Sequence, residues 1–186
     1  MSNNIFSGGK DVQLLEMLDA REKRQLKQQQ LLEKSTNDTL ISMTMNIPGS
    51  VKVTDELIKI FHLVYDQVKM DWQSELLHEE LLPLKTGYEG YFLIKENASV
   101  VKKHLINLEE ELPFGRLFDL DVLELRQEEL VVLSRKDFNL SPRTCFICKE
   151  NAKECGRSRS HSIEELQLAI SDYINERRDM LNDKRS

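Results

Sequence analysis

Apolar and polar residues recur along the chain with two periods, which separate helical from strand-like segments. This pattern predicts helices over 11–34, 54–68, 71–82, 97–108 and 162–181, and strands over 39–47, 88–94, 116–125 and 130–133. The elements follow one another without a strict βαβ rhythm. We therefore expect an α+β fold with a small mixed sheet and flanking helices.

The helix predicted over 11–34 is polar for much of its length. Its first turns carry an apolar face: Leu14, Leu15 and Leu18. Few apolar residues follow, so we do not expect the middle of this helix to be deeply buried. Arg21, Arg24 and Gln28 are spaced three and four residues apart and therefore share one face. That face either binds a ligand or is solvated.

The length of the chain limits how many domains these elements can build. At 186 residues the chain fits one domain, 1–186, because a typical domain has roughly 100–200 residues. We expect residues 1–10 to form a flexible N-terminus and residues 143–161 to form a cysteine-rich loop.

Charge is distributed unevenly in this acidic chain, whose net charge is −6. Duplex binding depends on neutralising phosphates, so we do not expect a nucleic acid partner. Two groups of residues are nevertheless basic: Arg21, Lys23, Arg24 and Lys27, and Arg135, Lys136, Arg143, Lys149, Lys153, Arg157 and Arg159. Local basic clusters on an acidic protein suit a compact polyanion, although each cluster is also typical of a solvated surface.

The sequence also bears on the compartment. No apolar run approaches the ~20 residues that span a bilayer, and the N-terminus lacks the pattern of a signal peptide. Three cysteines, an odd number, do not form a disulfide framework. We expect a cytoplasmic protein without a membrane partner.

A pair of carboxylates, Asp119 and Asp121, lies in an otherwise apolar, strand-like stretch beside Arg116. Residues two apart on a strand point to the same face, so the carboxylates stand side by side. Two carboxylates that close raise the pKa of one of them unless a cation lies between them. Mg²⁺ suits this arrangement, because substrate phosphates complete its oxygen shell. The alternative is a strand whose acidic face meets solvent.

Four metal-ligand side chains, Cys145, Cys148, Cys155 and His161, lie within 17 residues. Three thiols and an imidazole can close a tetrahedral zinc site. Alternatively, the cysteines are reduced thiols without a metal. His161 has a rival role as a proton acceptor, because its ordinary pKa of ~6.5 suits a general base.

A basic segment precedes the last predicted helix. Arg157 and Arg159 stand just before Ser162, which begins a capped helix with Glu165 in its first turn. Phosphate groups favour arginines beside a helix N-terminus. Ligand binding and ordinary capping are compatible here.

Several motifs follow one another in a fixed order: Arg21-x-x-Arg24-Gln25-x-x-Gln28, Pro48-Gly49 followed by Lys52, Gly87-x-Glu89-Gly90, Pro113-x-Gly115-Arg116-Leu117-x-Asp119-x-Asp121-Val122-Leu123, Ser134-Arg135-x-Asp137, and Pro142-Arg143-x-Cys145-x-x-Cys148-x6-Cys155-x5-His161. In this combination the chain resembles the citrate lyase holo-acyl carrier protein synthase family, also called apo-citrate lyase phosphoribosyl-dephospho-CoA transferase. The resemblance covers the chain from Arg21 to its last helix. The D-x-D strand is also similar to the metal motif of polymerase-beta-like nucleotidyltransferases. This resemblance implies that the fold can contain a nucleotidyltransferase-like core.

The resemblance implies a reaction. A serine of the acyl carrier (gamma) subunit of citrate lyase attacks the phosphate nearest the ribose of triphosphoribosyl-dephospho-CoA, and pyrophosphate leaves. Catalysis then depends on positioning and charge neutralisation. We expect Asp119, Asp121 and Arg116 to be catalytic, with Mg²⁺ on the two carboxylates. The expected substrate-binding residues are Arg21, Arg24, Gln28, Arg135, Arg143, Arg157 and Arg159. A third metal ligand is not fixed, Glu124 and Asp137 being candidates.

Two other functions are compatible with the residues. One is a non-catalytic, zinc-stabilised adaptor that binds a citrate lyase subunit, in which the cysteines matter most and Asp119 and Asp121 are solvated. The other is a small nucleic-acid-binding module built on the cysteine loop, which the net charge and the lack of interleaved aromatic residues disfavour.

Overall fold

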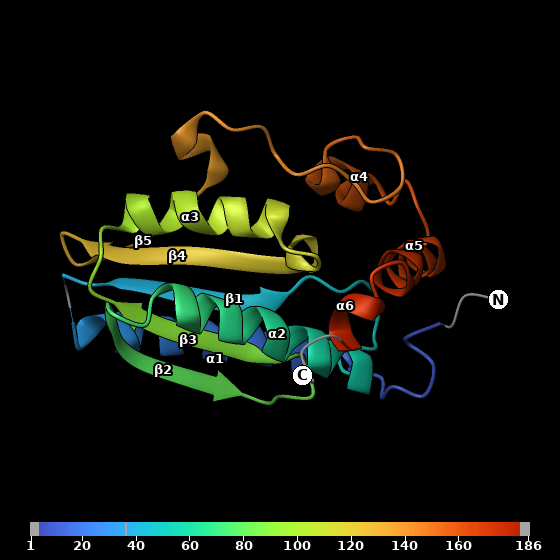
Figure 1. The fold of residues 1–186 in the computed structure, drawn as a ribbon, viewed down its shortest axis with the longest axis horizontal. Coiled ribbons are helices and arrows are strands. Elements are labelled where there is room, and N and C mark those ends of the chain that lie inside the picture. The colour runs from blue at the N-terminus through green and yellow to red at the C-terminus, as the bar shows by residue number, and fades with distance from the viewer. Residues whose placement is uncertain (1–3, 36, 183–186) are drawn as a thin grey trace.

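The computed structural model describes residues 4–35 and 37–182 as one sheet with helices on both faces (Figure 1). Its strands are β1 Thr39–Met45, β2 Leu76–Leu82, β3 Glu89–Ile94, β4 Phe118–Arg126 and β5 Glu129–Leu133. Its helices are α1 Leu14–Glu33, α2 Asp55–Asp71, α3 Ala98–Glu111, α4 Ala152–Ser158, α5 Ile163–Asn175 and α6 Asp179–Asn182, with 3₁₀ turns η1 Gly115–Leu117 and η2 Arg135–Phe138. The expected single-domain α+β fold is confirmed.

The sheet has the strand order β2-β3-β1-β4-β5, and all neighbouring strands are antiparallel. The expectation of a mixed sheet is therefore wrong. Each helical crossover, α2 between β1 and β2 and α3 between β3 and β4, skips one strand, so parallel strands never become neighbours. This is a split βαβ arrangement, extended by the β4–β5 hairpin. A nucleotidyltransferase-like core is not confirmed.

The helix predicted over 71–82 does not exist as such. Helix α2 ends at Asp71, and β2 begins at Leu76 and pairs with β3 along its length. Leu and Glu are good helix formers, but β-structure depends on cross-strand packing more than on intrinsic preference. The predicted helix over 162–181 is also divided, because α5 ends at Asn175 and α6 follows separately.

Two apolar clusters lie on opposite faces of the sheet. The larger lies under α2 and α3 and includes Ile41, Met43 and Phe92 from alternate strand positions. The smaller lies under α1 and joins Leu32 of that helix to Leu40 and other strand residues on the same face of the sheet. Figure 1 shows α2 in front of the sheet and α1 behind it. Strand β1 is thus covered on both sides, and its first five residues are buried.

The N-terminal part of the described chain packs differently from the flexible segment that the sequence predicted. Residues 1–3 of the expected flexible segment lie outside the described residues, and within 4–10 Ile5 and Phe6 are buried in the larger cluster. The leucines at the start of α1 are instead exposed: Leu14, Leu15 and Leu18. No helix among the described residues is long and apolar enough to cross a membrane.

Gly115 links α3 to β4 where the chain runs against the helix backbone. A Cβ at this position would lie 2.4 Å from the Leu108 carbonyl oxygen, so only glycine fits without a shift. The turn η1 follows, and β4 starts at Phe118 rather than at 116. This junction sets where the strand that carries both aspartates begins. Beyond β5, the chain passes over α3 to α4 and α5 at one end of the sheet (Figure 1).

Candidate active site

Asp119 and Asp121 stand on the same face of β4, as predicted. In the sheet they oppose Thr44 and Ser42 of β1, and this face lies toward α1. Burial raises the pKa of Asp121, and the charge of Asp119 raises it further. Asp121 is nevertheless exposed to solvent, so a ligand can reach it.

Helix α1 lays its polar face over this part of the sheet. Gln28 Nε2 donates a 2.9 Å hydrogen bond to Ser42 Oγ, and both side chains are buried. Arg24 Nε and Nη2 each lie 2.9 Å from a carboxylate oxygen of Glu89. As expected, most of the middle of this helix is exposed, and between residues 19 and 30 only Ala20 and Gln28 are buried. Gln28 can be buried because its amide finds a polar partner on β1. The shared face of the three residues is confirmed.

Glu89 is a site residue to which the sequence assigned no role. Only 3% of it is exposed, and it accepts hydrogen bonds from Arg24 and from the Tyr91 hydroxyl. In the sheet, Glu89 and Asp119 flank Thr44 on its two sides. A buried carboxylate needs such partners, because an unpaired charge is costly to bury. Its place in the Gly87-x-Glu89-Gly90 motif was the signal that could have identified it.

A small cavity of about 130 Å³ opens beside these groups. Its wall includes three cationic side chains and one carboxylate: Arg21, Arg24, Lys52 and Asp119. They come from α1, from the segment after β1 and from β4, which are far apart in the sequence. Lys52 was also given no role from the sequence, although it follows the Pro48-Gly49 turn in the family pattern.

Buried charges replace the missing sheet partner at the start of β4. Strand β5 reaches back only to Val122, so the backbone groups of Phe118 and Leu120 face no strand on that side. Arg143 Nη1 donates to the Phe118 carbonyl at 2.6 Å, Glu109 accepts from Leu120 N–H at 2.9 Å, and Lys102 donates to the Leu120 carbonyl at 2.8 Å. These side chains fix the strand edge beneath the two aspartates.

Arg143 connects this edge to the carboxylates. Its Nη1 lies 3.2 Å from Asp119 Oδ1, and its Nη2 pairs with Glu109. Burial raises the pKa of Glu109, while the Arg143 charge opposes that shift. Burial lowers the pKa of Lys102. Arg143 is thus the one member of the second basic cluster that the described residues show in contact with the aspartates.

The other expected arginines lie elsewhere. Arg116 points away from the carboxylates, donating to the carbonyls of Thr144 and Cys145 at 3.2 and 2.9 Å and stacking on Phe146. A large cavity of about 1150 Å³ lies on this side of the molecule, and four of the expected arginines line it: Arg116, Arg135, Arg143 and Arg159.

Within this large cavity Arg135 is already engaged. It pairs with Glu110 and donates to the Ser141 carbonyl at 3.0 Å. Arg157 is exposed on α4. The structure therefore divides the expected arginines between the two cavities, except for Arg157, which lines neither.

The two candidate third metal ligands are also separated from the aspartates. Glu124 lies at the alternate strand position, on the opposite face of β4, and pairs with Arg126. Asp137 accepts hydrogen bonds from the Ser134 backbone and side chain at the start of η2. Neither belongs to the face that carries Asp119 and Asp121.

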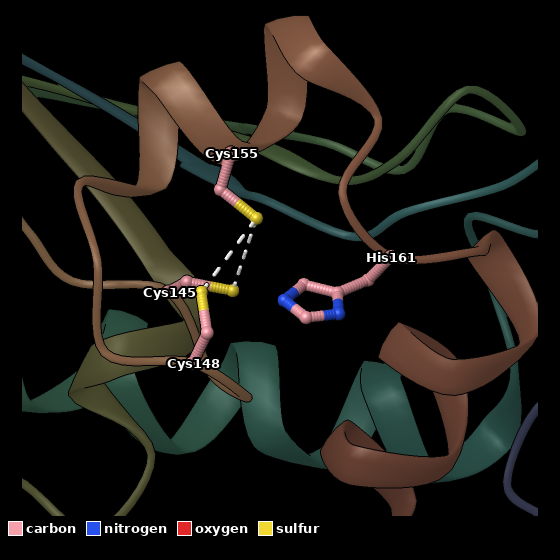
Figure 2. A group of neighbouring side chains, drawn as sticks. All are labelled: Cys145, Cys148, Cys155 and His161. Carbon is pink, nitrogen blue, oxygen red and sulfur yellow. Dashed lines mark hydrogen bonds between the residues drawn. The ribbon is translucent and has the colours of Figure 1, made fainter.

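Cys145, Cys148, Cys155 and His161 converge in space (Figure 2). Their ligand atoms all lie within 4.8 Å of one another. Cys155 Sγ is 3.5 Å from Cys145 Sγ and 4.0 Å from Cys148 Sγ. Four tetrahedral ligands with Zn–S distances of about 2.3 Å place sulfurs about 3.8 Å apart, so this cluster could bind a metal such as zinc.

Local structure prepares the cluster. Cys145 is buried, which by itself raises the pKa of its thiol, but backbone N–H groups of Ile147 and Cys148 point at the sulfur and the net shift is downward. Burial and the neighbouring Cys145 raise the pKa of Cys155 to about 11. His161 Nε2 is buried without a hydrogen-bond partner among the described residues. An orphaned imidazole nitrogen beside three sulfurs fits a metal ligand.

Comparison with known proteins agrees with this arrangement of motifs. The sequence model of the apo-citrate lyase phosphoribosyl-dephospho-CoA transferase family matches residues 12–177. A probable apo-citrate lyase phosphoribosyl-dephospho-CoA transferase of Streptococcus pyogenes serotype M5 (strain Manfredo) is 42% identical over 175 residues, 94% of this chain and 91% of the relative.

More distant relatives carry related names. The apo-citrate lyase phosphoribosyl-dephospho-CoA transferase of Escherichia coli O139:H28 (strain E24377A / ETEC) is 32% identical over 92% of this chain and 90% of its own. Protein CitXG of Haemophilus influenzae is 38% identical over 85% of this chain but only 34% of its own length. On this evidence the chain belongs to the apo-citrate lyase phosphoribosyl-dephospho-CoA transferase family.

Proposed function

We propose that this protein transfers the phosphoribosyl-dephospho-CoA group from triphosphoribosyl-dephospho-CoA to apo-citrate lyase. The observation that carries the proposal is the cavity in which Arg21, Arg24 and Lys52 face Asp119. Cations collected from distant parts of the chain beside a pair of carboxylates suit a polyphosphate and its metal ion. The name of the family agrees with this chemistry.

The acceptor is a serine of the acyl carrier subunit, and the chemistry is of the nucleotidyl-transfer type. A bond forms between the serine oxygen and the phosphorus nearest the ribose, and the bond from that phosphorus to the bridging oxygen of pyrophosphate breaks. The hydroxyl proton passes to a base, and pyrophosphate departs with the electron pair of the broken P–O bond. The three cysteines are free, as in the reducing cytoplasm, where we place the reaction.

Asp119 and Asp121 would hold Mg²⁺. The raised pKa of Asp121 supports the fit, because part of its cause is the charge of Asp119, which a cation between the two would relieve. When bound, Mg²⁺ neutralises developing charge on the phosphates. The protein itself contributes orientation: Arg143 holds Asp119, and Arg24 places its charge near Asp121.

The cysteine–histidine cluster has a structural role in this proposal, through zinc. Direct attack by the acceptor serine needs no covalent enzyme intermediate, so a thiol nucleophile has no task. Among the cluster residues only Cys145 and Cys155 are buried, and a loop with so little apolar core gains most from a metal. Arg116 supports this loop by holding the carbonyls of Thr144 and Cys145.

A non-catalytic adaptor is not favoured, because the family is one of transferases. The test incubates the full chain with apo-carrier, precursor and Mg²⁺, and measures the intact mass of the carrier. We expect the carrier to gain the mass of the prosthetic group, and pyrophosphate to appear in equal amount. An unchanged carrier mass at stoichiometric protein would overturn the proposal.

Variants of the same assay test the carboxylates. Asp119→Asn and Asp121→Asn remove a charge with little change of shape, so we expect folded proteins whose transfer rates fall by about 10³-fold, as when one electrostatic contact to a transition state is lost. Asp66, an exposed carboxylate on α2, provides the matched control Asp66→Asn. Near-native rates of both site variants at limiting Mg²⁺ would show that these aspartates do not bind the metal.

A further inference from the structure

Lys52 is partly buried and faces another cation, Arg21. Its pKa is lowered, first by burial and then by the charge of Arg21. Its Nζ donates to the Ile47 carbonyl at 2.6 Å. Among the described residues, no carboxylate lies within 4.0 Å of the charged nitrogens of either Lys52 or Arg21. Two like charges are thus held together without a counterion in the structure.

The segment that carries Lys52 is fixed rather than free. Val12 N–H donates to the Ser50 carbonyl at 3.0 Å, and Asp11 pairs with Val51 as an isolated bridge. On the other side, Gln167 Nε2 of α5 donates to the Pro48 carbonyl at 3.1 Å. Contacts from both the N-terminal segment and α5 therefore hold the loop between β1 and α2. Lys52 is presented into the cavity by a prepared scaffold.

The position of this pair defines what it can bind. Lys52 and Arg21 line the same cavity as Asp119, the proposed metal ligand. A cavity of about 130 Å³ admits a compact anion and is too small for the nucleoside and pantetheine parts of the precursor. Phosphate oxygens satisfy both a point charge and a guanidinium fork.

We propose that Lys52 and Arg21 form a subsite for the two terminal phosphates of the precursor, the part that leaves as pyrophosphate. This assignment rests on the proposed function. It places the leaving group on the α1 side of Asp119, so that the phosphate under attack lies over the aspartate pair. Lys52 binds substrate by charge at the far end of the phosphate chain.

The test uses inorganic pyrophosphate as the probe and the full-length protein in chelator, so that binding depends on the protein cations alone. Titration calorimetry should give at least about tenfold weaker binding for Lys52→Met and about threefold weaker binding for Arg21→Gln. Lys95 is an exposed lysine that follows β3 at the end opposite Glu89. It provides the control Lys95→Met, which should bind pyrophosphate as the wild type does.

Thermal melting shows which variants are folded. Should Lys52→Met fail to fold, Arg21→Gln decides the matter, because Arg21 is exposed on α1 and tolerates replacement. Wild-type affinity in every folded site variant, or no pyrophosphate binding by the wild type, overturns the subsite.

The two proposals can fail separately. Wild-type protein that transfers the prosthetic group, together with a Lys52→Met protein of unchanged pyrophosphate affinity and unchanged KM for the precursor, overturns the subsite and leaves the function standing. Wild-type protein that binds pyrophosphate through Lys52 but modifies no carrier overturns the proposed function and leaves an anion site.

Discussion

The two faces of the sheet are built on different principles. The face under α2 and α3 is mainly apolar, with Ile41, Met43 and Phe92 fully buried. The face under α1 is apolar only near the C-terminal end of that helix. Toward the other end it carries Glu89, Asp119 and other polar groups.

Polar burial costs free energy unless partners are supplied, so a face that served only stability would be apolar throughout. The polar end of the α1 face coincides with the cavity and with the motifs of the family. The apolar face therefore mainly stabilises the fold, whereas the polar end of the α1 face carries the candidate active site. Substitutions on the two faces should have different consequences.

The largest effect is expected on the apolar face. Phe92→Ala removes a fully buried ring that packs on Tyr65 at a centroid distance of 4.6 Å, and should lower the free energy of unfolding by about 3–5 kcal/mol. The transfer rate per folded molecule should stay close to that of the wild type. Urea denaturation and the carrier mass assay measure the two quantities. Leu77→Ala, at a half-exposed leucine on β2, should cost less than about 1 kcal/mol.

The next effect tests whether the polar face also supports the fold. Arg24→Met leaves the Glu89 carboxylate buried without its cation, which should cost about 3 kcal/mol of unfolding free energy as well as transfer activity. Glu89→Gln in the same protein should restore part of the stability but not the activity. A double-mutant cycle with no coupling between the two positions would show that the pair does not act as a unit.

A third comparison concerns the cysteine–histidine cluster, which lies apart from both faces. We expect the wild type to carry about one zinc ion per chain, and Cys148→Ser and His161→Ala should each lose it. A site saturated about 100-fold above its dissociation constant contributes about 2.7 kcal/mol, so stability should fall by about that amount. Metal analysis of protein purified without chelator measures the ion.

One set of results would overturn the structural role of His161. Metal-free wild type, a stable His161→Ala protein and loss of the rising, low-pH limb of the pH–rate profile would place His161 in the chemistry instead, as a general base. Serine at position 158, which is exposed on α4, offers a control: Ser158→Ala should keep the metal.

The sequence predicted those parts of the site that depend on local spacing. The two-residue period of a strand placed Asp119 and Asp121 on one face of β4. The spacing of a helix placed Arg24 and Gln28 on one face of α1. The spacing of the cysteines and His161 likewise anticipated a cluster that the structure assembles. In each case the relevant residues are close in the chain, so backbone geometry alone fixes their relation.

What the sequence could not predict depends on pairing between distant segments. Arg24 and Glu89 are 65 residues apart, and only the order of the strands brings α1 over β3. The burial of Gln28 follows from a partner on β1, Ser42, that no local pattern identifies. Strand β2 was misread as helix because its residues favour helices, whereas its pairing with β3 is a tertiary fact.

The smallest effect is a gain in stability on the polar face. Asp121 has a raised pKa, caused first by burial and then by Asp119, so its ionised form destabilises the folded protein. Asp121→Asn removes that charge and should be more stable than the wild type at neutral pH. Because Asp121 is exposed, solvent screening should keep the gain to at most about 1 kcal/mol.

The pH dependence of this gain distinguishes a charge effect from repacking. The penalty from ionised Asp121 is fully present above its folded-state pKa and is lost as the pH falls through that value toward its ordinary pKa of about 3.8. Unfolding free energies of wild type and Asp121→Asn should therefore converge on acidification, while Asp66→Asn shows no such convergence. A pH-independent difference would mean that the aspartate is not strained by its surroundings. A stabilised but inactive Asp121→Asn would show that this face gives up stability for its function.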